Sequence, residues 1–200
     1  MYLVENITEK ELSDISSEIG EAFVTNELFH EFGTIEERRD LVLKYMKIYV
    51  RCTYESKTLY STDDGAGYIG LAVSNEKAVF PQIKMMLRLL ALIPWRIAKP
   101  FMKQIKEIAN EDKRYTNHPY LEVLMVCVRK EYQGQGKAKE LVNFAKKMAQ
   151  QRNIPLLFDT DMANYAKMYQ HLGCELYHTN RASNGVTRYN LVWLSKTEQS

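Results

Sequence analysis

The segment from residue 120 to residue 161 constrains the fold of this chain most strongly. It begins with the apolar run YLEVLMVCV (120–128), passes through the glycine-rich stretch QGQGKA, continues with a helical pattern over 137–152 and ends with a second apolar run, PLLFDTD (155–161). Two buried strands that are joined by a helix are expected to be parallel, with a right-handed crossover. The sequence therefore predicts a strand–turn–helix–strand unit at the centre of a sheet.

The flanking segments add helices before this unit and antiparallel strands after it. Capping boxes at Thr8–Glu11 and Thr34–Glu37 predict helices over 8–23 and 34–50. Further predicted elements are a β-hairpin of KTLYSTD and YIGLAVS around Asp64-Gly65, a helical segment over 81–110 interrupted at Pro94 and Pro100, a short helix over 164–172 that stops at Gly173, and strands over 174–179 and 187–194 around an SNG turn. This order predicts an α/β (α+β) fold with a mixed sheet flanked by helices, and residues 1–200 as a single domain.

Charge and apolar patterning exclude several classes of protein. A net charge of +2, without long basic blocks, gives no footprint for nucleic acid. The most apolar window, 85–101, carries three basic residues and is broken by Pro94, so it is too short and too charged to span a membrane. The N-terminal stretch lacks the basic and apolar regions of a secretory signal. Three cysteines without metal-ligand spacing predict reduced thiols in the cytoplasm and no metal site.

The glycine turn QGQGKA is a candidate phosphate site. A turn that leads from a strand into a helix points backbone N–H groups and the positive end of the helix dipole at one spot. Gly134 and Gly136 allow close approach, and the charge of Lys137 opposes the dipole, which a bound anion would offset. A Walker A loop needs Ser or Thr in place of Ala138, and a dinucleotide fingerprint needs Gly or Ala in place of Lys139. Both are excluded, which leaves another phosphate site or a purely structural turn.

Gln133, Gly136 and Ala138 match the Q/R-x-x-G-x-G/A signature of the GNAT acyltransferases (Gcn5-related N-acetyltransferases). The chain resembles this family over residues 118–180. The segment FDTDMANYAKMYQHLGCEL is also similar to the family, because Tyr169 and Gly173 hold its Tyr-to-Gly spacing. The resemblance implies the GNAT fold, in which two central parallel strands splay apart, with 81–110 as a helical elaboration.

The resemblance also implies acetyl-CoA as the acetyl donor, with no metal. The pyrophosphate would lie on the amides of the glycine turn, and the pantetheine arm would pair with the backbone of the central strand. The residues expected to contact acetyl-CoA are Met125, Val126, Cys127, Val128, Gln133, Gly134, Gln135, Gly136, Lys137, Ala138 and Asn164.

Acetyl transfer to an amine needs a group that takes the amine proton and one that protonates the leaving thiolate. Glu122 is the candidate base: it is the only charge in a nine-residue apolar strand, and it resembles the general-base glutamate of the histone-acetylating branch in lying eleven residues before Gln133. The alternatives are that Glu122 faces solvent or pairs with Arg114, and His118 is the substitute base. The family's tyrosine position implies Tyr169 as the general acid.

The residues that contact the acceptor are implied only by the family's acceptor pocket. In the family, the first helices and the segment before the central strand form this pocket. Phe29, His30 and Tyr120 are therefore the expected acceptor contacts. The leading interpretation is an N-acetyltransferase that acts on a primary amine of a small molecule, as a monomer or homodimer. A protein or peptide N-acetyltransferase and a non-catalytic acyl-CoA-binding sensor are the alternatives. The apolar segment 81–110 has three candidate roles: a pocket wall, a contact with a second copy, or a membrane-surface contact.

Overall fold

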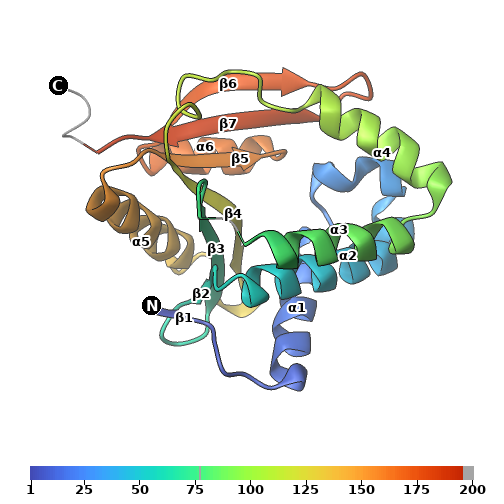
Figure 1. The fold of residues 1–200 in the computed structure, drawn as a ribbon, viewed down its shortest axis with the longest axis horizontal. Coiled ribbons are helices and arrows are strands. Elements are labelled where there is room, and N and C mark those ends of the chain that lie inside the picture. Colours follow the sequence, from blue (N-terminus) through green and yellow to red (C-terminus); the bar gives the residue numbers. More distant parts are fainter. Residues whose placement is uncertain (77, 196–200) are drawn as a thin grey trace.

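The computed structural model describes residues 1–76 and 78–195. In this range the strands form one seven-stranded sheet in the order β1-β2-β3-β4-β5-β7-β6 (Figure 1). The strands are β1 (Tyr2–Leu3), β2 (Leu59–Ser61), β3 (Gly67–Val73), β4 (Leu121–Val128), β5 (Leu156–Thr160), β6 (Glu175–Arg181) and β7 (Thr187–Trp193). β4 and β5 are parallel, and the other neighbouring pairs are antiparallel. This confirms the predicted mixed sheet with a parallel central pair.

The helices of the described residues are α1 (Glu9–Phe23), α2 (Ile35–Glu55), α3 (Val79–Leu92), α4 (Trp95–Glu107), α5 (Lys137–Arg152) and α6 (Ala163–His171), with 3₁₀ helices η1 (Glu27–Phe32) and η2 (Lys130–Tyr132). Both predicted capping boxes are formed: the Thr8 and Thr34 hydroxyls accept from the N–H groups of Glu11 and Glu37, whose carboxylates accept from the threonine N–H groups. The prediction for α2 stopped five residues short of its end at Glu55.

The two prolines of the helical segment behave differently. Pro94 is the N-cap of α4, so the predicted interruption there is confirmed. Pro100 lies inside α4, and the interruption predicted there is wrong. The ring removes one backbone donor, but burial of Phe101 and Gln104 one turn apart holds the helix in place. The Gln104 side chain donates to the carbonyl of Leu28 at 2.8 Å, which ties α4 to η1.

β4 contributes to the cores on both faces of the sheet. Leu121 and Val123 pack in the cluster that contains the buried face of α5, whereas Met125 and Cys127 pack in the cluster of α1 and α2. The change of face occurs at a β-bulge, where Leu124 is an extra residue between the pairs Gly70–Met125 and Leu71–Val123. One extra residue reverses the alternation of side chains. The α5 and α6 layer therefore covers one face, and α1 and α2 cover the other, with α3 packed on α2 and α4 on η1 (Figure 1).

Candidate active site

β4 and β5 are paired only at their beginnings and then diverge. The pairing joins Leu121–Val123 to Leu156–Phe158, while β4 continues to Val128 and β5 to Thr160. A cavity of about 490 Å³ is lined by residues of both strands beyond the paired segment. Backbone groups of β4 that β5 does not pair are available to a ligand that enters this opening.

The cavity brings together most of the predicted cofactor contacts. Among the residues predicted from the sequence, its lining contains Met125, Val126, Cys127, Val128, Gln133, Gly134, Gly136, Lys137, Ala138 and Tyr169. Gln135 and Asn164 do not line it. The Gln135 side chain donates to the carbonyl of Glu131 instead, at 2.9 Å, and Asn164 is exposed near the start of α6.

The glycine turn is open toward the cavity. Gly134 and Gly136 have φ angles of +76° and +79°, a conformation that side chains disfavour. A Cβ on either glycine would meet no atom within 4 Å, so the backbone conformation and not crowding requires glycine. Gly136 is the N-cap of α5 and provides no side-chain cap for the first N–H groups of the helix. Open space in front of an uncapped helix N-terminus fits the pyrophosphate of acetyl-CoA.

The Lys137 side chain has partners within the protein. Its ammonium lies against the carboxylates of Asp64, from the β2–β3 turn, and of Glu140, one turn along α5. The hydrogen bond that Lys137 donates to Asp64 is the main cause of the raised pKa of Lys137. The charge of Lys137, which a bound anion was expected to offset, is therefore already balanced by Asp64 and Glu140.

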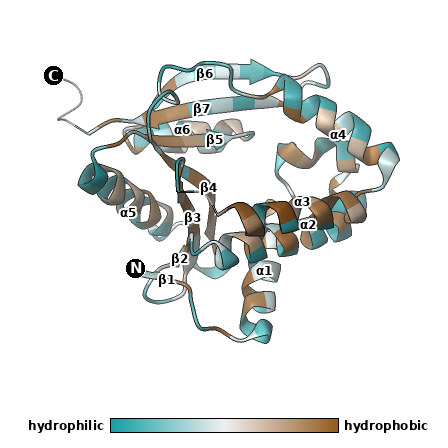
Figure 2. Ribbon diagram, viewed as in Figure 1, coloured by the Kyte–Doolittle hydropathy of each residue, from teal (hydrophilic) through white to brown (hydrophobic). Residues whose placement is uncertain are grey.

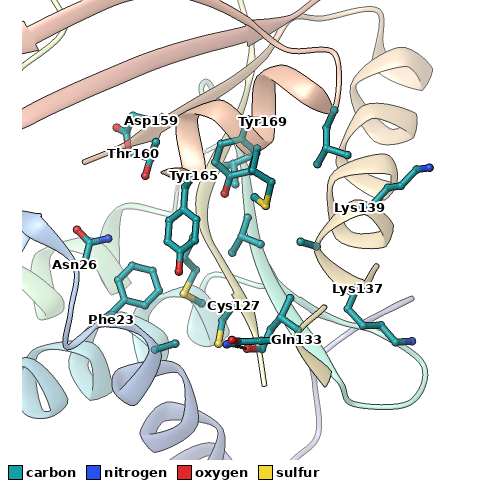
Figure 3. A pocket seen from close by; sticks show the side chains of 18 of the residues that line it. Phe23, Asn26, Cys127, Gln133, Lys137, Lys139, Asp159, Thr160, Tyr165 and Tyr169 are labelled. Carbon is teal, nitrogen blue, oxygen red and sulfur yellow. Dashed lines mark hydrogen bonds between the residues drawn. The ribbon is translucent and has the colours of Figure 1, made fainter. Parts of the chain in front are cut away.

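Tyr169 faces the cavity from α6 (Figure 3). Its side chain is 7% exposed, and its ring packs on Phe158 with 4.8 Å between centroids. Burial raises the pKa of Tyr169 above its usual value, and the neighbouring Tyr165 adds to this rise. The phenol is therefore protonated at neutral pH, which is the state that a proton donor needs.

Glu122 lies beside the cavity and is not part of its lining. It is partly buried on β4 just before the bulge, where it pairs in register with Ala72 and Leu157. Burial is the main cause of the raised pKa of Tyr49 and of Asp159, and the charge of Glu122 adds to the rise in both. Arg114, the alternative partner for Glu122, is held by Asp112 and by the carbonyl of Tyr177.

An acidic group that the sequence interpretation missed lies at the C-terminal end of β5. Arg188 of β7 makes a two-pronged contact with Asp161, at 2.9 and 2.8 Å, and lies 3.4 Å from Asp159. Both aspartates line the cavity, but the Asp161 side chain is only 4% exposed, whereas that of Asp159 is 49% exposed. In the sequence FDTD, the two aspartates are separated by one residue at the end of the predicted buried strand. This pattern was the signal that could have identified them.

The surrounding protein changes the titration of Asp159. Although its side chain is accessible from the cavity, the enclosing walls reduce its access to bulk water and raise its pKa. Arg188 opposes this rise, and the charges of Asp161 and Glu122 add to it. Asp159 is thus a carboxylate held in a cleft beside a second carboxylate and an arginine, an arrangement typical of functional sites.

The acceptor contacts expected from the sequence do not line the cavity. Phe29 is fully buried in an aromatic cluster with Phe32, Tyr45 and Phe101, because the 3₁₀ turns of η1 direct it inward, so its predicted contact with the acceptor is wrong. His30 is half exposed and lies 3.7 Å from Glu27, and Tyr120 precedes β4, where its N–H donates to the Ser74 hydroxyl. The wall on this side is formed by Ala22, Phe23, Asn26 and Leu28.

Among residues 1–76 and 78–195, no group of three or more His, Cys, Asp and Glu side chains could hold a metal ion. The helices of the same residues are too short or too polar to span a lipid bilayer.

Residues 103–175, which include β4, the glycine turn, α5, β5 and α6, match the family described as "Acetyltransferase (GNAT) domain". This segment of the chain is a GNAT acetyltransferase domain by that match. Solved structures show that the fold of the chain is similar to that of GNAT acetyltransferases. Arylalkylamine N-acetyltransferase 2 from Aedes aegypti is 16% identical, with a TM-score of 0.57, and the match covers 94% of this chain and 95% of that one. A histone acetyltransferase HPA2-related structure from Corynebacterium glutamicum is 12% identical, with a TM-score of 0.60 and 94% and 93% coverage.

These identities are low, so the two structures establish the GNAT fold alone. A third solved structure, from Agrobacterium tumefaciens, is 24% identical, with a TM-score of 0.34; the match covers 36% of this chain and only 55% of that one. A search of curated proteins found no match. Together the family match and the fold confirm the predicted family and the predicted enzyme class, an acetyl-CoA-dependent acetyltransferase.

Proposed function

We propose that this GNAT domain transfers the acetyl group of acetyl-CoA to a primary amine of a small molecule. The cavity between the diverging strands carries this proposal, because Gln133 of the glycine turn lies at one end and the Asp159 carboxylate at the other (Figure 3). A carboxylate in a cleft attracts an ammonium ion. The arylalkylamine acetyltransferase among the similar folds adds support for a small amine as the acceptor.

Acetyl-CoA supplies the activated acetyl group. We assign its pyrophosphate to the N–H groups around Gly134 and Gly136 and its pantetheine arm to the β4 backbone from Met125 to Val128. Asp159 holds the ammonium group of the acceptor. Glu122 receives the proton that the nitrogen must lose before it can attack, directly or through water.

The remaining steps concern charge at the thioester. A backbone N–H of β4 beyond the bulge donates to the carbonyl oxygen as negative charge develops there. The C–N bond forms as the C–S bond breaks, and Tyr169 donates its phenolic proton to the departing sulfur. Cys127 takes no covalent part, since it is 3% exposed and burial raises the pKa of its thiol to about 12.

We also propose a cytoplasmic location, with the chain acting as one domain and as a monomer or homodimer. The three cysteines are free and buried, which suits a reducing compartment. All strands of the described residues belong to one sheet, which supports a single domain.

Calorimetric titration with acetyl-CoA, followed by an assay of thiol release with arylalkylamines, alkyl polyamines and short peptides, tests the proposal. We expect saturable binding of acetyl-CoA and turnover with at least one small amine. Turnover with peptides alone would establish the protein or peptide alternative, which the histone acetyltransferase-related fold favours. Binding without turnover would indicate the acyl-CoA sensor. No binding would refute all three.

A further inference from the structure

The outward face of α3 is apolar along its length. Its exposed large side chains are Val79 (64% exposed), Phe80 (87%), Ile83 (53%), Met86 (53%), Leu87 (62%) and Leu90 (65%). At 100° per residue these six occupy an arc of about 120°. Leu89 is on the other side, where it is buried and α3 packs against α2. Figure 2 shows α3 as hydrophobic over most of its length. A contiguous exposed patch of this kind marks an interaction site.

The outward face of α4 is basic. Arg96, Lys99, Lys103 and Lys106 are exposed, and together with the exposed Trp95 (79%) and Met102 (59%) they occupy a similar arc of about 120°. Phe101 and Gln104 are buried on the opposite side. Among the described residues, no carboxylate forms an ion pair with Arg96, Lys99 or Lys106, and Lys103 has only Glu107 at 3.6 Å.

Positive charge predominates over the whole segment. Residues 78–106, which contain α3 and all of α4 except its last residue, Glu107, include six basic residues and no Asp or Glu. Four of these basic residues lie on α4. The other two, Lys84 and Arg88, lie on α3 beside its apolar arc, and the Lys84 ammonium is 3.3 Å from the Glu55 carboxylate. Apolar side chains, unpaired cations and an exposed tryptophan on consecutive short helices are the features of helices that lie in a membrane interface.

We propose that the exposed faces of α3 and α4 form a docking surface for a membrane rich in anionic lipids. The apolar arc of α3 enters the headgroup–acyl boundary, Trp95 anchors at the level of the headgroups, and the cations of α4 contact lipid phosphates. The helices lie on the bilayer and do not cross it, in agreement with the lack of a membrane-spanning helix in the described residues.

Charge complementarity favours a lipid surface over a second copy of the chain. A two-fold dimer would bring the same patch of both subunits together. The unpaired cations on the two copies of α4 would then face each other across an apolar contact, where like charges repel most strongly. An anionic bilayer offers both an apolar layer and the opposite charge.

Flotation of the protein with vesicles tests the proposal. One set is pure phosphatidylcholine and the other contains 30% phosphatidylglycerol. We expect binding to the anionic vesicles at low salt, weaker binding at 0.5 M salt, and little binding to neutral vesicles. Emission from Trp95 should shift to shorter wavelength on binding, and brominated lipids should quench it. Trp193→Phe removes the signal of the other tryptophan.

Two variants separate the charged and apolar contributions. Arg96→Glu/Lys99→Glu should weaken binding by about twenty-five-fold or more, since each cation near an anionic surface contributes about fivefold. Leu87→Ser/Leu90→Ser should remove the emission shift. Lys147→Glu/Lys167→Glu, on α5 and α6, makes the same change in net charge away from this surface and should bind as the unaltered protein does. Circular dichroism confirms that each variant is folded.

Other outcomes overturn the proposal. These are no binding to either kind of vesicle, or equal binding to both kinds. An equal loss of vesicle binding in Lys147→Glu/Lys167→Glu and in Arg96→Glu/Lys99→Glu would also overturn it. A dimer in sedimentation equilibrium that Leu87→Ser/Leu90→Ser dissociates, without vesicle binding, would assign the surface to a second copy instead.

Discussion

Gly136→Ala tests whether the glycine turn binds the pyrophosphate. Gly136 has φ = +79°, where a residue with a Cβ costs about 1 kcal/mol. A Cβ there meets no atom within 4 Å, so strain and not a clash is the expected cost to the fold. For a chain of this size, a loss of 1 kcal/mol lowers the unfolding temperature by about 2–4 °C.

The effect on binding should be larger than the effect on stability. Relief of the strain turns at least one N–H of the turn away from the anion, and a hydrogen bond to a charged group contributes about 1.5–3 kcal/mol. We therefore expect the Kd for acetyl-CoA to rise by about 10- to 150-fold in calorimetry. Thermal unfolding of the unliganded variant gives the cost to stability separately.

Gly185→Ala is the matched control. Gly185 lies in the β6–β7 turn with φ = +94°, and a Cβ there also meets no atom within 4 Å. The Gly185→Ala variant should lose about as much stability as Gly136→Ala and keep the affinity of the unaltered protein for acetyl-CoA. If the two variants lose stability equally and bind acetyl-CoA equally well, the turn has only a structural role and the reasoning is refuted.

The remaining predictions concern individual side chains. Tyr169→Phe should lower kcat by about 10²-fold or more with an unchanged Kd for acetyl-CoA; a normal kcat would exclude it as the acid. Glu122→Gln should mainly lower kcat, whereas Asp159→Asn should mainly raise KM for the amine; the reverse pattern would exchange their roles. Phe29→Ala should reduce the free energy of unfolding by about 3–5 kcal/mol in urea titration, and a change under 1 kcal/mol would contradict its place in the core. Cys127, with its raised pKa and 3% exposure, should resist iodoacetamide at pH 8 in the folded protein, as mass spectrometry would show.

The glycine turn, the strands and most helix boundaries could be predicted because local interactions determine them. The capping boxes act within four residues, and the continuous apolar runs of β4 and β5 follow from burial of the strands. Helix α4 was predicted less well. Its Pro100 is a local break signal, but packing of the far side of the helix on η1 outweighs one lost hydrogen bond.

The acceptor end of the site could not be predicted in the same way. Asp159 and Asp161 are near each other in sequence, but Arg188, which fixes their arrangement, arrives from β7 by strand pairing. The local sequence around Phe29 does not indicate whether its side chain faces a pocket or the core. Its direction depends on how η1 packs against α2 and α4.

The sequence by itself determined the family, the donor and the parallel strand–turn–helix–strand unit, because these depend on short segments whose geometry is set within the segment. Tertiary structure decided where β4 and β5 separate, which carboxylate enters the opening and which charges balance Lys137. It also left the apolar arc of α3 and the basic face of α4 uncovered. These features depend on contacts between segments far apart in the chain, where packing and long-range charge determine the outcome.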